Sequence, residues 1–226
     1  MRLAFAHAID RAAYVSETGA VHLRAATGGF LPPGMPGHAS SIGLLHDPEA
    51  ARRLLEEAGY PGGEHFPSVE LLYAGDPYSS VSASFLQQTW KETLGVEVRL
   101  SGVEWGEFIR RRDEDPPDLS ISAWAADYPD PDNMLRVLFH SRDGVNPIRW
   151  RNSDFDAQLE RASRLTDRKE RIELYQAADR ILVSEAAVLP LGYAQGRQLV
   201  KPYVRLPRTP PYLLRLKHAV VQRPQG

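Results

Sequence analysis

Residues 78–103 read YSSVSASFLQQTWKETLGVEVRLSGV, and this stretch decides the fold class. Its first part has apolar side chains at helical spacing, namely Val81, Phe85, Trp90 and Leu94. Gly95 follows, a residue that readily takes the left-handed conformation with which helices end. Residues 96–103 then alternate between apolar and other side chains, as in a strand with one buried face. A long helix that leads directly into a half-buried strand indicates an α/β protein.

The same alternation of helices and strands extends in both directions along the chain. Helical spacing predicts helices over 3–17, 47–58, 105–112, 133–140, 155–165 and 168–184. Further strands are expected at 68–74, 118–124, 188–193 and 198–200, and residues 24–46, rich in Gly and Pro, read as a long ordered loop. We therefore expect an α/β fold with a mixed sheet of about five strands flanked by helices. Residues 1–200 would form one domain, and 201–226 a Pro-rich tail.

The helix starts at residues 47 and 130 share the dipeptide Asp-Pro. Asp47 can accept a hydrogen bond as the N-cap of the 47–58 helix, Pro48 suits its first position, and Gly59 can close it. Asp130 and Pro131 repeat this chemistry later in the chain, which predicts that Asp130 is also a cap.

Composition excludes several classes of function. The chain has 226 residues, 42% of them hydrophobic and 25% charged, with a formal net charge of -2. Because the 27 basic residues are scattered among 29 acidic ones, we expect no nucleic-acid partner. The absence of cysteine excludes disulfides, a structural zinc ribbon and a thiol nucleophile. No apolar run reaches the roughly 18 residues of a membrane span, and the N-terminus reads as a helix rather than a signal peptide.

Catalytic and metal motifs are also missing. The sequence has no GxSxG, HExxH, GxxxxGK[ST] or strand followed by GxGxxG, and its seven histidines form no i, i+3 or i, i+4 pairs. Counting an EF-hand loop from Asp130 places Leu135 where Gly is required and Ser141 where Glu is required. We predict no cofactor, no metal site and no enzymatic activity, and a hydrolase with an unusual acid pair is the weakest alternative.

The loop WAADYPDPDN, residues 124–133, carries three acids in ten positions. Asp130 and Asp132 have structural interpretations, as the helix cap and as a first-turn acid favoured by the helix dipole. Asp127 has none. It follows a predicted strand, where α/β proteins bind ligands, and it lies between Trp124 and Tyr128. A carboxylate among aromatic rings suits an ammonium group, and a purely structural turn acid is the alternative.

Six segments in order resemble the solute-binding proteins of peptide and nickel ABC transporters, the dipeptide and oligopeptide-binding class. They are RLAFAHAIDR (2–11), LPPGMPG (31–37), DPEAARRLLEEAGYPGG (47–63), TWKETLGVEVRL (89–100), WAADYPDPDN (124–133) and RKERIELYQAADRILVSEAAVLPL (168–191). The resemblance implies a periplasmic-binding-protein-like lobe at 1–200, the C-terminal one of two, located in the periplasm or at the cell surface. The tail at 201–226 would return to the missing N-terminal lobe.

The resemblance also implies partners and roles. In oligopeptide-binding members, the Asp at the position of Asp127 pairs with the α-ammonium of the peptide, and the Trp at the position of Trp124 lines the cleft. Tyr128 and Trp105 are further expected ligand-binding residues. The two lobes close over a small peptide or related molecule, and an ABC permease receives it. Ile121 stands where some peptide binders have a basic residue, and Ala123 where the family often has Gly. A lobe reused as a sensor or interaction module is an alternative.

Overall fold

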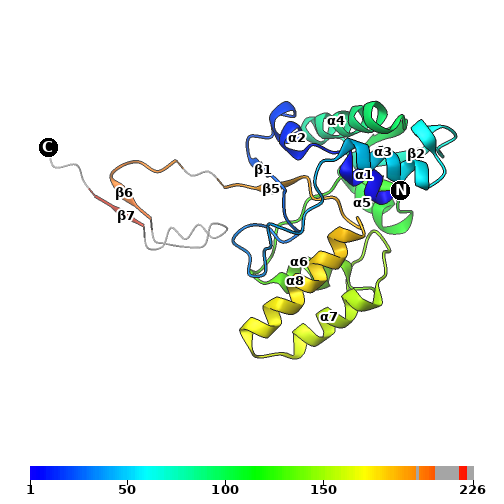
Figure 1. Cartoon of the computed structure of the whole chain (residues 1–226). Helices are drawn as coiled ribbons and strands as arrows, with labels where there is room; N and C mark the ends of the chain where they lie inside the picture. Colours follow the sequence, from blue (N-terminus) through cyan, green and yellow to red (C-terminus); the bar gives the residue numbers. More distant parts are fainter. Residues whose placement is uncertain (197–198, 207–218, 223–226) are drawn as a thin grey trace.

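The computed structural model describes residues 1–196, 199–206 and 219–222 (Figure 1). Its helices are α1 (Arg2–His7), α2 (Arg11–Glu17), α3 (Pro48–Glu57), η1 (Pro61–Gly63), α4 (Pro77–Leu94), α5 (Trp105–Glu114), α6 (Pro131–Phe139), α7 (Ser153–Arg164) and α8 (Arg168–Ser184). Its strands are β1 (Leu23–Ala25), β2 (Val69–Ala74), β3 (Val98–Val103), β4 (Leu119–Ser120), β5 (Gly192–Ala194), β6 (Val204–Arg205) and β7 (Val220–Val221). The predicted α/β class is confirmed.

The strands are divided among three sheets. The central sheet is parallel, in the order β3-β2-β4, while β1 pairs with β5 and β6 pairs with β7, both antiparallel. β2 and β3 match residue for residue from Val69 opposite Val98 to Ala74 opposite Val103. Since parallel strands need a crossover, α4 connects β2 to β3 and α5 connects β3 to β4.

A first apolar core lies between this sheet and α1, α3 and α4. Trp90 of α4 is buried there against Phe5, and its indole N–H donates to the Phe5 carbonyl at 3.1 Å. Gly95 ends α4 with φ of 70°, as its position before the strand predicts. Val81, which shares the helical spacing of Phe85, Trp90 and Leu94, is exposed.

A second apolar core joins α6, α7 and α8, which form a separate group below α1 to α4 in Figure 1. Leu135, Phe155 and Tyr175 are buried where the three helices meet. The Gly-rich loop is attached to this core by the buried Asp179 of α8, whose carboxylate accepts the backbone N–H groups of Phe30 and Leu31 at 2.7 and 3.2 Å.

Several predicted elements differ from those in the structure, and among them the strand expected at 188–193 is present only as β5, Gly192–Ala194. The single helix over 3–17 is broken into α1 and α2, because Asp10 caps the second helix by accepting from the N–H groups of Ala12 and Ala13. The strand expected at 118–124 pairs at Leu119 and Ser120, one further bond runs from Ile121 N–H to the Leu72 carbonyl, and residues 122–124 beyond it are exposed. Of the strand expected at 198–200, residue 198 lies outside the described residues, and Leu199 and Val200 form no strand.

The tail expected at 201–226 is described only in part. β6 and β7 pair through Val204 with Val221 and Arg205 with Val220, and Figure 1 shows this ribbon apart from the two cores. Residues 207–218 and 223–226 lie outside the described residues. Among the described helices, none is both long enough and apolar enough to cross a membrane.

Candidate ligand-binding site

The topology brings the expected ligand-binding residues to one edge of the central sheet. β3 and β4 both run parallel to β2, so their carboxyl ends lie at the same edge. Trp105 opens α5 two residues after the end of β3, and the segment after β4 leads through Trp124 to Asp127. In parallel α/β sheets this is the edge at which ligands bind.

Residues 121–126 lead from β4 to Asp127 with few main-chain hydrogen bonds to the rest of the described chain. The segment continues the ladder once, where Ile121 N–H donates to the Leu72 carbonyl at 2.9 Å. Residues 122–125 are exposed. Within the part of the chain that the structure describes, no N–H group of residues 122–126 donates to a protein acceptor. This segment therefore presents free donors beside Asp127.

Asp127 is exposed and is tied to the protein on one side only. Its Oδ2 accepts a hydrogen bond from Nδ2 of Asn133 at 3.3 Å, and its backbone N–H donates to Oδ1 of Asn133 at 3.2 Å. Among the described residues, Oδ1 of Asp127 has neither a hydrogen-bond donor nor a cation as partner. One carboxylate oxygen is thus available to a ligand.

Trp124 lies close to Asp127 because both residues donate a hydrogen bond to the side-chain amide of Asn133. The Trp124 indole N–H donates to Oδ1 of Asn133 at 2.9 Å, the oxygen that also accepts from the backbone of Asp127. The side chain is 42% exposed, so the ring is available to a ligand as well as held by the protein.

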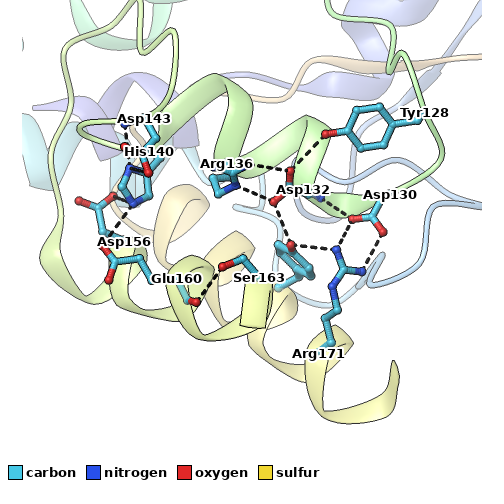
Figure 2. A network of polar contacts seen from close by, with 11 residues as sticks. Tyr128, Asp130, Asp132, Arg136, His140, Asp143, Asp156, Glu160, Ser163 and Arg171 are labelled. Atoms are coloured by element: carbon cyan, nitrogen blue, oxygen red, sulfur yellow. Dashed lines mark hydrogen bonds and ion pairs between the residues drawn. The ribbon is translucent and has the colours of Figure 1, made fainter. Parts of the chain in front are cut away.

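Asp130 has a structural role, as its Asp-Pro sequence predicts. Its Oδ1 accepts the N–H of Asp132 at 2.9 Å and caps α6, and both its oxygens accept from Arg171 of α8 at 2.7 Å (Figure 2). Burial opposes ionisation, but the hydrogen bonds from Arg171 and from the Asp132 backbone outweigh it, and the pKa of Asp130 is lowered. The pairing raises the pKa of Arg171.

The carboxylate of Asp132 is likewise hydrogen-bonded to groups of the protein itself. It accepts from Nε of Arg136 at 2.8 Å, from the hydroxyl of Tyr175 at 3.1 Å and from the hydroxyl of Tyr128 at 3.1 Å (Figure 2). Burial, with a smaller contribution from the charge of Asp132, raises the pKa of Tyr128. The hydroxyl of Tyr128 is therefore engaged with a structural acid, and its ring remains half exposed.

Trp105 lies at the same edge, and no hydrogen bond or aromatic pair of the described residues joins it to the loop 124–133. Its ring stacks on Phe108 with centroids 5.5 Å apart and an interplanar angle of 20°, and the side chain is 60% exposed. Phe108 is buried beneath it. The stacking orients a large apolar surface outward beside the ends of the sheet.

His140 lies away from this edge, at the end of α6. The ring is fully buried, and its Nδ1 accepts the N–H groups of Arg142 and Asp143 at 3.3 and 3.1 Å. Its Nε2 faces Glu160 at 3.7 Å and has no hydrogen-bond partner among the residues that the structure describes (Figure 2). A buried ring cannot reach a ligand. Among the described residues no group of three or more His, Asp or Glu side chains could hold a metal ion.

Sequence reasoning did not identify Asn133 and Arg171, which hold the acidic loop in place. Arg171 lies on α8, far along the chain, and nothing local in the sequence marks it as the partner of Asp130. Asn133 could have been found, because an Asp-Pro cap at 130–131 places it in the first turn of the helix, close to the loop that precedes it.

Comparisons with known proteins agree with this architecture. Residues 1–146 match the family model described as bacterial extracellular solute-binding proteins, family 5 Middle. The chain is 33% identical to Heme-binding protein A of Haemophilus influenzae over 91% of its length and 38% of the relative's. It is 31% identical to the periplasmic oligopeptide-binding protein OppA of Escherichia coli, over 69% of its length and 28% of the relative's.

Solved structures give the same result. The Escherichia coli murein tripeptide binding protein MppA superposes with a TM-score of 0.80 at 26% identity, over 97% of this chain and 44% of that one. The chain thus spans less than half the length of these relatives. On the family match and these likenesses, the chain belongs to the bacterial extracellular solute-binding proteins of family 5.

Proposed function

We propose that this chain binds small peptides, or related molecules with a free ammonium group, as one lobe of a two-lobe receptor. Several relatives carry names that state peptide binding, such as OppA and MppA, whereas Heme-binding protein A is named for a different ligand. Because these names differ in ligand, the ligand class proposed for this chain depends on the geometry of its own site.

The observation that carries the proposal is the half-satisfied carboxylate of Asp127. Of the acids in its loop, Asp130 is neutralised by Arg171 and Asp132 by Arg136, while Asp127 faces solvent with one oxygen open. Charge-assisted hydrogen bonds are about twice as strong as neutral ones, and they gain strength when a second lobe excludes water. An ammonium group supplies the positive charge that would pair with Asp127.

The segment 122–126, exposed at residues 122–125, favours a peptide over a simple amine. An extended peptide laid along free main-chain donors can pair with them as an added strand would, with its N-terminus directed at Asp127. The half-exposed rings of Trp124 and Trp105 add apolar surface and attraction for the cation. Tyr128 contributes its ring, since its hydroxyl is held by Asp132.

The second lobe, the tail and the permease belong to the same proposal. The chain spans 28% to 44% of the relatives above, which leaves room for a second lobe in proteins of this family. We infer that residues 1–200 form the ligand-binding lobe and that 201–226 pack on the other lobe. We also place the receptor outside the cytoplasmic membrane, where it delivers its ligand to an ABC permease. The same lobe used as a sensor is the second candidate, and a permease-independent response to ligand would favour it.

The proposal is tested on the chain itself, by NMR titration with a dipeptide such as Ala-Ala and with its N-acetylated form. We expect weak binding of Ala-Ala, with a dissociation constant of about 1 mM or above, because half of the cleft contacts are missing. Acetylation removes the ammonium charge and should abolish detectable binding. Asp127→Asn should do the same for Ala-Ala.

Glu57→Gln is the matched control. It removes one exposed negative charge at the end of α3, from which the chain runs through η1 to the amino ends of the strands. We expect no change in the affinity for Ala-Ala. Equal affinities for the free and acetylated dipeptides, or an unchanged affinity in Asp127→Asn, would overturn the assignment of Asp127. Turnover of either dipeptide would instead favour an enzyme.

A further inference from the structure

Asn133 is the buried residue to which the exposed loop is attached. It lies in the first turn of α6 and is only 2% exposed. Its Oδ1 accepts two hydrogen bonds, from the Trp124 indole at 2.9 Å and from the Asp127 backbone at 3.2 Å. Its Nδ2 donates to Oδ2 of Asp127 at 3.3 Å. One side chain thus contacts both the aromatic and the acidic residue of the site.

The helix does not need this side chain for its own start. Asp130 caps α6 through the N–H of Asp132, and the backbone N–H of Asn133 already donates to the carbonyl of Asp130 at 3.1 Å. Asn is also a poorer helix former than Ala or Leu, by a few tenths of a kcal/mol. The polar atoms of the Asn133 side chain therefore serve the loop alone.

The orientation of the amide is fixed by its partners. Two N–H donors meet at one end of the amide, which requires its oxygen there, and a carboxylate oxygen lies at the other end, which requires the NH2 group. A flipped amide would face donors with donors and an acceptor with an acceptor. Only one arrangement of Asn133, Trp124 and Asp127 satisfies all the groups.

We propose that Asn133 is the positioning residue of the ligand site, a role that rests on the proposed function of Asp127. By occupying Oδ2 of Asp127 with a neutral donor, it orients the carboxylate so that Oδ1 faces the ligand ammonium. It holds the Trp124 ring at a fixed place beside that oxygen. It does so without adding a charge that would compete with the ligand.

The positioning is tested without ligand, through the indole N–H resonance of Trp124 in the full chain, assigned with Trp124→Phe. In Asn133→Ala the indole loses its acceptor, so its resonance should move and its exchange with solvent should speed up. In Asn133→Asp a carboxylate oxygen can still accept from the indole, so the resonance should stay close to that of the wild type. Unchanged indole exchange in Asn133→Ala would overturn the proposal.

Asn133→Asp separates positioning from general support of the fold. It replaces the donor at Oδ2 of Asp127 with a second carboxyl group, and two carboxyls this close share a proton. Two coupled carboxyls titrate in two steps, so in Asn133→Asp the assigned 13C resonance of the Asp127 carboxyl should follow both steps, whereas in Asn133→Ala it should follow one. A new carboxyl that does not contact Asp127 would leave the Asp127 resonance with a single step, and that result would contradict the inference.

Ligand binding provides a third test of the positioning role. Asn133→Ala should weaken Ala-Ala binding about tenfold, as expected for loss of one or two hydrogen bonds that orient the carboxylate. If Asp127→Asn abolishes binding while Asn133→Ala alters neither affinity nor the indole, the positioning role is wrong and the proposed function stands. If Asn133→Ala releases the indole while Asp127→Asn leaves binding intact, the loop is positioned by Asn133 but the proposed function is wrong.

Discussion

The starts of α3 and α6 share the dipeptide Asp-Pro, and the two differ in what surrounds them. Asp47 accepts the N–H of Ala50 at 2.9 Å and caps α3 at the border of the first core. Asp130 caps α6 through the N–H of Asp132, two residues on rather than three, and also binds Arg171 of α8 through both oxygens. The local chemistry is equal, whereas only the second cap connects two helices.

This difference explains how an exposed loop can hold a site. The cap at Asp130 is anchored to α8, and Asp132 is bonded to Tyr175 of the same helix, so the base of the loop is fixed to the second core. Asp127, only three residues before Asp130, is free of both tasks. A site that must meet a ligand needs such a rigid support, because ordering it on binding would cost affinity.

The largest expected effect on stability comes from replacing each of the two capping residues separately by alanine. Asp130→Ala should lower the free energy of unfolding by about 3 kcal/mol, from the lost cap and the half-buried Arg171 left unpaired. Asp47→Ala should cost about 1 kcal/mol, the usual value of a cap. Denaturant unfolding of the two variants measures both.

Asparagine variants isolate the contribution of the ion pair with Arg171, because Asn is as good a helix cap as Asp. Asp47→Asn should stay within about 0.5 kcal/mol of the wild type, and Asp130→Asn should still lose about 2 kcal/mol. Equal losses at the two positions would mean that the pair with Arg171 contributes nothing beyond the cap.

Asp179 extends the comparison to an acid without a cation. It is buried, its hydrogen bonds within the described part of the chain come from backbone N–H groups, and burial raises its pKa to about 6 from 3.8. A raised carboxyl pKa stabilises the fold below 3.8, and this stabilisation is lost as the pH rises through 6. The loss amounts to about 2 to 3 kcal/mol. In Asp179→Asn the free energy of unfolding should therefore rise more steeply between pH 4 and 6 than in the wild type.

The contribution of Asp130 to the pH dependence of stability should have the opposite sign. Its pKa is lowered, so its stabilisation is present above the ordinary value of 3.8 and is lost as the pH falls through the folded-state pKa. Asp130→Asn should therefore lose less stability than the wild type on acidification below pH 4, a smaller effect than that at Asp179. If the free energy of unfolding fell equally below pH 4 in the wild type and in Asp130→Asn, Arg171 would not hold the carboxylate ionised.

The local parts of this arrangement were predictable from the sequence, and the tertiary parts were not. Asp-Pro at 47–48 and 130–131 and Gly95 locate helix ends correctly, since a cap depends on a few neighbouring residues. The break of the first helix at Asp10 was missed, because the apolar stripe continues past it. The partner of Asp130 lies on another helix, and periodicity carries no information about such contacts.

The strands show the same limit. β2 and β3 follow from alternation, but the strand expected at 118–124 pairs over only two residues, and the other strands fall into separate two-stranded sheets. Alternation indicates that a segment is extended, and it does not say whether a neighbour reaches it. The unpaired part, residues 122–126, is the part that we propose binds the ligand.

Asp127→Asn should have the smallest effect on stability. The side chain is exposed, and Asn can keep a hydrogen bond to Asn133, so the free energy of unfolding should change by less than about 0.5 kcal/mol. A loss as large as that of Asp130→Asn would make Asp127 a structural acid, like the other two of its loop.

The most direct test follows the carboxyl 13C resonances of Asp127 and Asp130 while Ala-Ala or N-acetyl-Ala-Ala is added. The proposed role of Asp127 predicts that Ala-Ala shifts the resonance of Asp127 and leaves that of Asp130 in place, since Arg171 already occupies Asp130. N-acetyl-Ala-Ala should shift neither. A shift of Asp127 that is equal with both dipeptides, or a shift at Asp130 alone, would contradict the assignment of Asp127 as the ammonium-binding residue.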